Sequence, residues 1–89
     1  MSTADEVREY VVGEYLPGMA TDDLDTDYDL LANGVIDSLG LLKLVAWVRD
    51  RFDVPVDDLD IAPENFRSVR AIRAFVEAGR RYTHGEVGT

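Results

Sequence analysis

Apolar residues recur at helical spacing in three separate stretches of the chain. The clearest stripe lies in residues 38–52, where apolar side chains repeat every three or four positions: Leu41, Leu44, Val45, Val48 and Phe52. Similar spacing in residues 4–15 and 68–79 predicts two more helices, and residues 57–66 are expected to hold a short helical piece. No stretch alternates as a strand would. The pattern predicts an all-α fold, a small bundle of three main helices plus one short helix.

Residues that commonly begin and end helices lie at the borders of these stretches. Thr3, with an acid three residues later, is the expected N-cap of the first helix, and Asp37 and Ser68 are the expected caps of the second and the last. Gly79 is expected to end the last helix. The side chains expected in the core are those of the stripe in residues 38–52 and three from the last helix: Val69, Ile72 and Phe75. Trp47 lies outside the stripe, and the pattern assigns it no role.

A long connection separates the first two helices. Residues 17–36 are rich in aspartate and contain Asn33-Gly34, a common turn pair. A loop of this length in a small domain usually has a function. Its apolar residues are expected to pack on the core: Leu24, Leu30, Leu31 and Ile36.

Length and composition set broad limits. Eighty-nine residues suit one domain, which we place at residues 1–81, followed by a flexible tail at residues 82–89. The chain has no cysteine, so disulfides and thiolate metal sites are excluded, and any thiol chemistry must come from a cofactor. No apolar run is long enough for a membrane span, and the first residues do not resemble a signal peptide. We therefore expect a cytoplasmic protein, without membrane attachment, that is a monomer.

The negative charge is confined to the first part of the chain. The formal net charge is −9; residues 1–37 hold ten acids and one base, whereas residues 38–89 hold eight of each. Nucleic acid is not expected as a partner, because a phosphate backbone requires a basic surface. Most of this acidity is explained by solubility.

Catalysis by the chain itself and metal binding both lack the residues they need. A catalytic serine requires a base and an oxyanion hole, but the only histidine, His84, lies in the expected tail, and no Gly-x-Ser-x-Gly motif occurs. The alternating acids from Asp23 to Asp29 resemble the start of a calcium loop, yet neither possible frame supplies both the glycine and the final glutamate. We expect neither an enzyme nor a metal site.

Ser38 has a setting that the other serines lack. It stands at the start of the most amphipathic stretch, in the segment Gly34-Val35-Ile36-Asp37-Ser38-Leu39. The order of features around it is a turn, two apolar residues, Asp-Ser-Leu, a helix ending in Arg51-Phe52, a proline turn and a capped last helix. From about residue 5 to residue 80 this order resembles free-standing acyl and peptidyl carrier proteins, whose attachment site for phosphopantetheine has Asp-Ser-Leu at its centre.

The resemblance implies a cofactor and a set of partners. A phosphopantetheinyl transferase would use coenzyme A and magnesium to attach 4′-phosphopantetheine to Ser38, with Asp37 in a supporting role. An adenylating or acyl-loading ligase and downstream pathway enzymes would then load, modify and remove a thioester. Carrier positions for contact with partner proteins correspond to apolar residues beside Ser38 and two basic residues near them: Leu39, Leu42, Ala46, Lys43 and Arg49.

Charge along the second helix narrows the class of carrier. Fatty-acid carriers usually have several acids there, whereas this stretch has Lys43, Arg49 and Arg51 with only Asp50. We therefore expect a carrier of acyl or aminoacyl intermediates in a nonribosomal peptide or polyketide pathway. A D-alanyl or fatty-acid carrier remains an alternative, and an unmodified helical adaptor is the alternative of another class. The sequence does not identify the cargo.

Overall fold

The fold is all-α, as the hydrophobic pattern predicts. The computed structural model describes residues 2–56 and 62–87, with side chains as far as Gly79. The helices are α1 (Thr3–Tyr15), the 3-10 turn η1 (Thr21–Asp23), α2 (Ser38–Phe52), α3 (Pro63–Phe66) and α4 (Val69–Val87). The described residues contain no strand. In the same residues no helix is long and apolar enough to cross a membrane.

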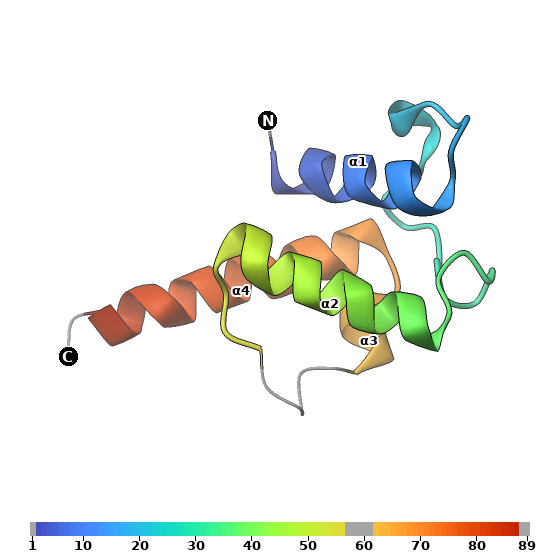
Figure 1. Cartoon of the computed structure of the whole chain (residues 1–89). Helices are drawn as coiled ribbons and strands as arrows, with labels where there is room; N and C mark the ends of the chain where they lie inside the picture. Colours follow the sequence, from blue (N-terminus) through green and yellow to red (C-terminus); the bar gives the residue numbers. More distant parts are fainter. Residues whose placement is uncertain (1, 57–61, 88–89) are drawn as a thin grey trace.

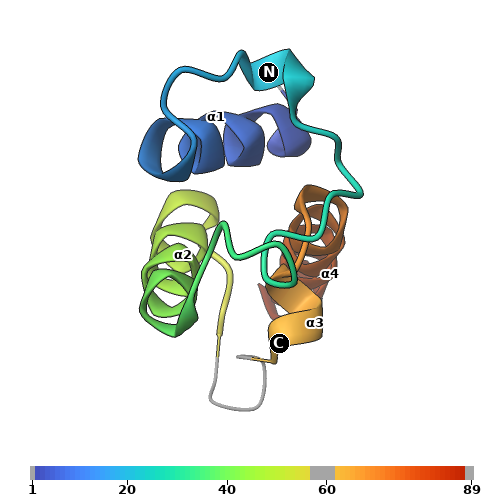
Figure 2. The same cartoon turned by 90° about the vertical axis from the view of Figure 1, so that its right-hand side faces the viewer.

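The three long helices surround one apolar core. In Figure 1, α1 runs in the opposite direction to α2 and α4. The view along the bundle in Figure 2 places α1 over the space between α2 on one side and α3 with α4 on the other. The core residues come from all of these elements: Val7 and Val11, Leu44 and Val48, Phe66, Ile72 and Val76 are fully buried. Burial of these apolar stripes is the main force that holds the helices together.

The expected core residues of the second helix and the last helix are mostly buried. Leu44, Val45, Val48, Phe52, Val69 and Ile72 are inaccessible or nearly so. Leu41 and Phe75 are only partly buried, which corrects the expectation. Leu41 belongs to the first turn of α2, at one end of the bundle, and the Phe75 ring packs against Phe66 at a centroid distance of 5.0 Å.

Two predicted helix boundaries are wrong. The N-cap of α1 is Ser2 rather than Thr3: the Ser2 hydroxyl accepts a hydrogen bond from Asp5 N, and the Asp5 carboxylate accepts one from Ser2 N. Gly79 does not end the last helix, whose backbone continues to Val87. A β-carbon at Gly79 would lie 3.0 Å from Val54 Cβ, so the glycine permits close packing there.

Other boundary predictions are confirmed. The second helix spans residues 38–52 with Asp37 as its N-cap, and the Ser68 hydroxyl accepts a hydrogen bond from Ala71 N at the start of the last helix. The expected helical piece between 57 and 66 is α3, with Pro63 in its first turn. Its expected first residues, 57–61, lie outside the described part. The boundary between a domain at 1–81 and a flexible tail at 82–89 stays a prediction.

The long loop between α1 and α2 packs on the helices and contributes apolar side chains to the core. Leu24, Leu30 and Ile36 are buried, as expected, and Leu31 is partly buried. Two backbone hydrogen bonds attach the loop to the end of α3 and the start of α4: Leu30 N donates to Arg67 O (2.7 Å), and Arg70 N donates to Thr26 O (2.9 Å). The loop therefore approaches α2 from a fixed position.

Ion pairs join the same loop to the α3–α4 junction and to the first turn of α4. Arg67 Nε lies 3.3 Å from Asp29 Oδ2, and Arg70 Nε lies 2.9 Å from Asp27 Oδ1. Asp29 Oδ1 also accepts hydrogen bonds from the backbone of Leu31 and Ala32. Within the described residues, no group of three or more His, Cys, Asp or Glu side chains is arranged to hold a metal ion. These carboxylates act as structural acceptors in the loop.

Candidate functional site at the start of α2

The turn that leads into α2 is built by the last residues of the loop. Gly34 has a φ of +74°, a conformation that glycine adopts without strain, and the buried Ile36 side chain fixes the chain to the core. Asp37 is extended (φ −95°, ψ −173°), and its Oδ1 accepts a hydrogen bond from Gly40 N at 2.8 Å. This N-cap starts the helix at Ser38.

Ser38 is the first residue of α2 and is exposed to solvent. Among the described residues, its hydroxyl and the backbone N–H groups of Ser38 and Leu39 have no hydrogen-bond partner. The α2 backbone dipole places partial positive charge at this end, and the first turn contains no acid after Asp37. The site can therefore present a reactive hydroxyl and stabilise a negatively charged group attached to it.

An apolar strip continues from Ser38 along the solvent side of α2. Leu39 and Leu42 are 63% and 55% exposed, which is unusual for large apolar side chains, and Ala46 is partly buried. Lys43 and Arg49 are exposed beside the strip, and Arg49 pairs with its neighbour Asp50. The predicted partner-binding residues thus lie on the same helix as Ser38, and all of them except the partly buried Ala46 are exposed. Their contact with partner proteins stays a prediction.

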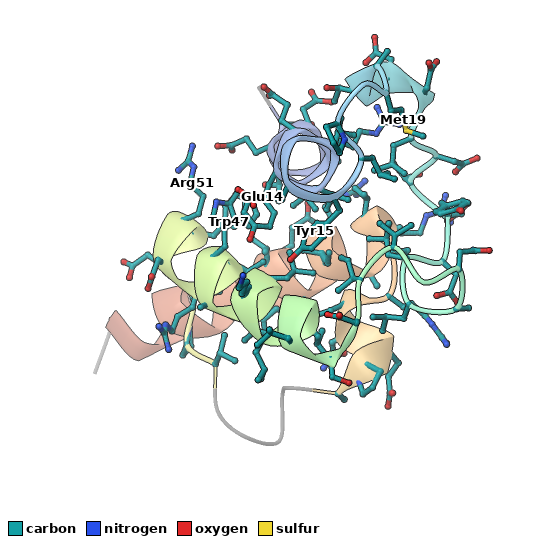
Figure 3. All side chains as sticks on the ribbon, turned by 45° about the vertical axis from the view of Figure 1, so that its right-hand side comes forward. Glu14, Tyr15, Met19, Trp47 and Arg51 are labelled. Carbon is teal, nitrogen blue, oxygen red and sulfur yellow. The ribbon has the colours of Figure 1, made fainter. Side chains whose placement is uncertain are left out.

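The opposite side of α2 faces α1, and Trp47 fills the contact. Its ring stacks on Tyr10 with a centroid distance of 4.2 Å and meets Phe52 edge-on at 5.5 Å. Figure 3 shows Trp47 and Tyr15 directed into the space between the two helices. Trp47 falls outside the core stripe because it packs on the aromatic side chains of α1 rather than on α4.

Tyr15 reaches the first turn of α2 from the end of α1. Its hydroxyl donates a hydrogen bond to the Gly40 carbonyl oxygen at 3.2 Å. Burial is the main cause that raises the pKa of Tyr15, and it also raises the pKa of Tyr10 to about 12. Both hydroxyls therefore remain protonated donors at neutral pH.

Gly40 makes this close approach possible. A β-carbon at this buried position would lie 3.2 Å from the Tyr15 hydroxyl, from Asp37 Oδ1 and from Ile36 Cγ2. The hydrophobic pattern did not indicate a role at this site for Gly40 or Tyr15. A glycine inside a helical pattern, three residues after the cap, was the available sign of a close contact, but nothing in the pattern indicated that Tyr15 would supply it.

Comparison with known proteins agrees with this geometry. The family model described as "Phosphopantetheine attachment site" matches residues 11–76, which include the loop, α2, α3 and the start of α4. No curated protein gives a significant match.

Two solved structures of KstB-PCP are similar to the chain. The structure of its apo form has 53% sequence identity and a TM-score of 0.70, and the match covers 82% of this chain and 80% of that one. The solution structure, of KstB-PCP in kosinostatin biosynthesis, has 52% identity and a TM-score of 0.63, with 88% of each chain covered. The similarity therefore extends over both the fold and most of the sequence.

Proposed function

Because the chain belongs to the family of carrier proteins with a phosphopantetheine attachment site, we propose that Ser38 is its attachment residue and that it serves a natural-product pathway. Proteins of this family bear the 4′-phosphopantetheine prosthetic group and are carriers rather than catalysts. The chain is accordingly a carrier protein and not an enzyme. It holds acyl or aminoacyl intermediates as thioesters, and the attachment residue is the finer step that we propose.

The exposed Ser38 hydroxyl is the observation that carries the proposal. Among the three serines, Ser68 is buried and its hydroxyl caps α4, while Ser2 caps α1 and lies outside the matched residues. Ser38 alone combines exposure, a free hydroxyl in the described structure and a place in the matched segment. The free N–H groups of Ser38 and Leu39 suit the phosphodiester of the arm.

The arm supplies the thiol that a chain without cysteine lacks. The residues of this chain hold and present the group: Ser38 provides the oxygen, and the Asp37 cap keeps the helix N-terminus formed around it. The Asp37 carboxylate next to Ser38 accepts a hydrogen bond from Gly40 N as the helix cap, which suits a hydroxyl that a separate transferase activates. A flexible arm raises the local concentration of its cargo at each partner site.

The assignment to natural-product biosynthesis is supported by similarity and by charge. KstB-PCP, more than half identical to this chain, belongs to kosinostatin biosynthesis. The exposed face of α2 carries Lys43 and Arg49 rather than the several acids usual in fatty-acid carriers. We propose nonribosomal peptide or polyketide chemistry as the class of pathway.

The expected partners are a phosphopantetheinyl transferase, an adenylating or acyl-loading ligase and downstream pathway enzymes. We propose that they dock on Leu39, Leu42 and Ala46, with Lys43 and Arg49 at the edge. The proposal includes a monomer working in the cytoplasm, where coenzyme A, the donor of the arm, is available. Exposed apolar side chains next to the attachment residue support this docking face.

Intact mass measurement tests the attachment residue. The purified chain is incubated with coenzyme A, magnesium and a phosphopantetheinyl transferase of broad specificity. We expect a gain of one phosphopantetheine on the wild type and on the control Ser2→Ala, and none on Ser38→Ala. Ser2 is a matched control because it is also an exposed serine at a helix N-terminus. Modification of Ser38→Ala would refute the assignment, and an unmodified wild type would favour the adaptor alternative.

Loading of the modified protein tests the docking face. We expect Leu42→Asp to lower the rate at which a pathway ligase loads the arm while the helical circular dichroism is retained, because the variant places a charge in an apolar contact. The rate for the wild type should depend only weakly on salt, since the charges near the strip are mixed. Normal loading of the variant, with a steep salt dependence of the wild type, would instead indicate an electrostatic interface.

A further inference from the structure

Three noncovalent contacts between side chains of α1 and residues of α2 follow one another along the two antiparallel helices. The Arg51 guanidinium pairs with the Glu6 carboxylate, the Trp47 ring stacks on Tyr10, and the Tyr15 hydroxyl donates to Gly40 O. As the residue number rises along α1, it falls along α2, as required for helices that run in opposite directions (Figure 1). Only the last of these contacts, the hydrogen bond from Tyr15, involves the turn that contains Ser38.

The Tyr15 side chain is itself packed against a second tyrosine. The Tyr10 and Tyr15 rings meet edge-on with a centroid distance of 6.4 Å. Tyr10 is in turn stacked on Trp47 in the middle of α2. The Tyr15 ring is therefore held against the aromatic centre of the interface while its hydroxyl contacts the first turn of α2.

That first turn is intrinsically weak. Gly40 favours unfolded conformations, and the N–H groups of Ser38 and Leu39 are unbonded within the described residues. Two side chains oppose fraying at Gly40: Asp37 accepts from its N–H and Tyr15 donates to its carbonyl. Because the glycine lacks a β-carbon, both side chains come close to it without a clash.

We propose that Tyr15 is a positioning residue for attachment of the arm: through its hydrogen bond to the Gly40 carbonyl, it fixes the turn that presents Ser38 to the transferase. The proposal rests on the proposed role of Ser38. Tyr15 contacts α2 at the buried Gly40, whereas Leu39 and Leu42 are exposed to solvent. Its loss should therefore affect the orientation of the hydroxyl more than the docking of the transferase.

Transferase kinetics of Tyr15→Phe test this role, because the variant removes one hydroxyl and retains the ring. At saturating coenzyme A and magnesium, we expect kcat to fall roughly three- to tenfold, as expected for a misplaced reacting group, with KM for the carrier changed less than about twofold. The matched control is Tyr28→Phe, which removes an exposed tyrosine hydroxyl with no side-chain hydrogen bond in the described structure. It should leave both constants unchanged.

Amide hydrogen exchange separates local positioning from general stability. In Tyr15→Phe the amides of Gly40 and Leu41, which bond to Asp37, should exchange faster, while the amide of the buried Val48 should not. An equal acceleration at all three amides would show a merely structural effect and overturn the proposal. Wild-type kcat together with wild-type exchange in the first turn would also overturn it.

Gly40→Ala approaches the same contact from the other helix. Its added β-carbon should displace the Tyr15 hydroxyl and lower kcat, and the double variant Tyr15→Phe, Gly40→Ala should be no slower than Gly40→Ala alone, because both changes break one interaction. Additive losses would contradict the proposal. If Tyr15→Phe is modified with wild-type kinetics while Ser38→Ala is not modified at all, only the role of Tyr15 is overturned. If Ser38→Ala is modified, the proposed function itself is overturned.

Discussion

Two tyrosine hydroxyls lie between α1 and α2 in surroundings that disfavour their ionisation. Burial is the largest cause that raises the pKa of Tyr10 to about 12, with the nearby Tyr15 and the Glu14 carboxylate adding to it. The folded state therefore favours the neutral phenol. Stability that depends on neutral Tyr10 is complete below pH 10.0, its ordinary pKa, and is lost as the pH rises towards about 12.

This predicts an alkaline loss of stability that depends on Tyr10. The free energy of unfolding, measured by urea titration, should fall between about pH 10 and about pH 12 in the wild type and fall less in Tyr10→Phe. Absorbance of phenolate should show that the variant lacks the latest tyrosine ionisation. An equally steep loss of stability in both proteins would mean that other groups cause it.

Val48 shows the contribution of one core residue. Its side chain is 0% exposed in the centre of the bundle. Val48→Ala should lower the free energy of unfolding by roughly 1–3 kcal/mol, through the lost burial and the cavity that remains. Arg49→Ala, at the next position but exposed, should change it by less than about 0.5 kcal/mol. Denaturant unfolding compares the two, and a similar cost for both would contradict the assigned helix face.

At the scale of elements, the long loop is held by the α3–α4 junction and the first turn of α4. Asp29 accepts two backbone hydrogen bonds within the loop and pairs with Arg67, whereas Asp27 makes an exposed pair with Arg70. Both carboxylates belong to the acidic run that resembles a calcium loop in sequence. Their different surroundings give them different importance for stability.

Substituting each acid in turn compares the cost of losing a structural hydrogen-bond acceptor, Asp29, with the cost of losing an exposed ion pair, Asp27. Asp29→Ala should lower the free energy of unfolding by about 1–2 kcal/mol, because the N–H groups of Leu31 and Ala32 lose their acceptor. Asp27→Ala should cost less than about 1 kcal/mol, the usual limit for an exposed pair. Urea titration of both variants measures the difference, and a larger cost at Asp27 would refute this ranking.

At the scale of the whole molecule, the carboxylates of the first part of the chain repel one another. Residues 1–37 hold ten acids and one base. Asp5 and Glu9 of α1 and Thr21 and Asp22 of η1 line one open hollow of about 300 Å³. The ion pairs that acids of this part form with Arg51, Arg67 and Arg70 are partly exposed. Each of them therefore offsets only a little of the repulsion among the acids.

Added salt should therefore stabilise the protein. Moderate sodium chloride screens the repulsion among the acids, and we expect the melting temperature to rise between low and moderate salt. Asp22→Asn, which removes one charge from the hollow, should raise the melting temperature at low salt and reduce the gain from added salt. Thermal melts of both proteins measure this, and a melting temperature that decreases steadily with salt would show that the ion pairs dominate.

Local features were predictable because they depend on neighbouring residues. The apolar period and the cap Asp37 defined α2, and Ser68 defined the start of α4. The order of features around Ser38 led to the carrier family, which the family match confirms. Where two local solutions were equally possible the sequence was ambiguous: Ser2 and Thr3 each precede an acid by three residues, and only the structure selects Ser2.

The contacts between helices were decided by the tertiary structure. A hydrophobic period shows which face of a helix is apolar. It does not show which other helix packs against that face or against the remaining faces, nor in what register. The stacking of Trp47 on Tyr10, the hydrogen bond from Tyr15 to Gly40 and the close packing of Gly79 on Val54 all depend on segments far apart in the chain. Sequence alone therefore determined the elements and the candidate serine, whereas packing of α1 against α2 determined how the turn bearing that serine is held.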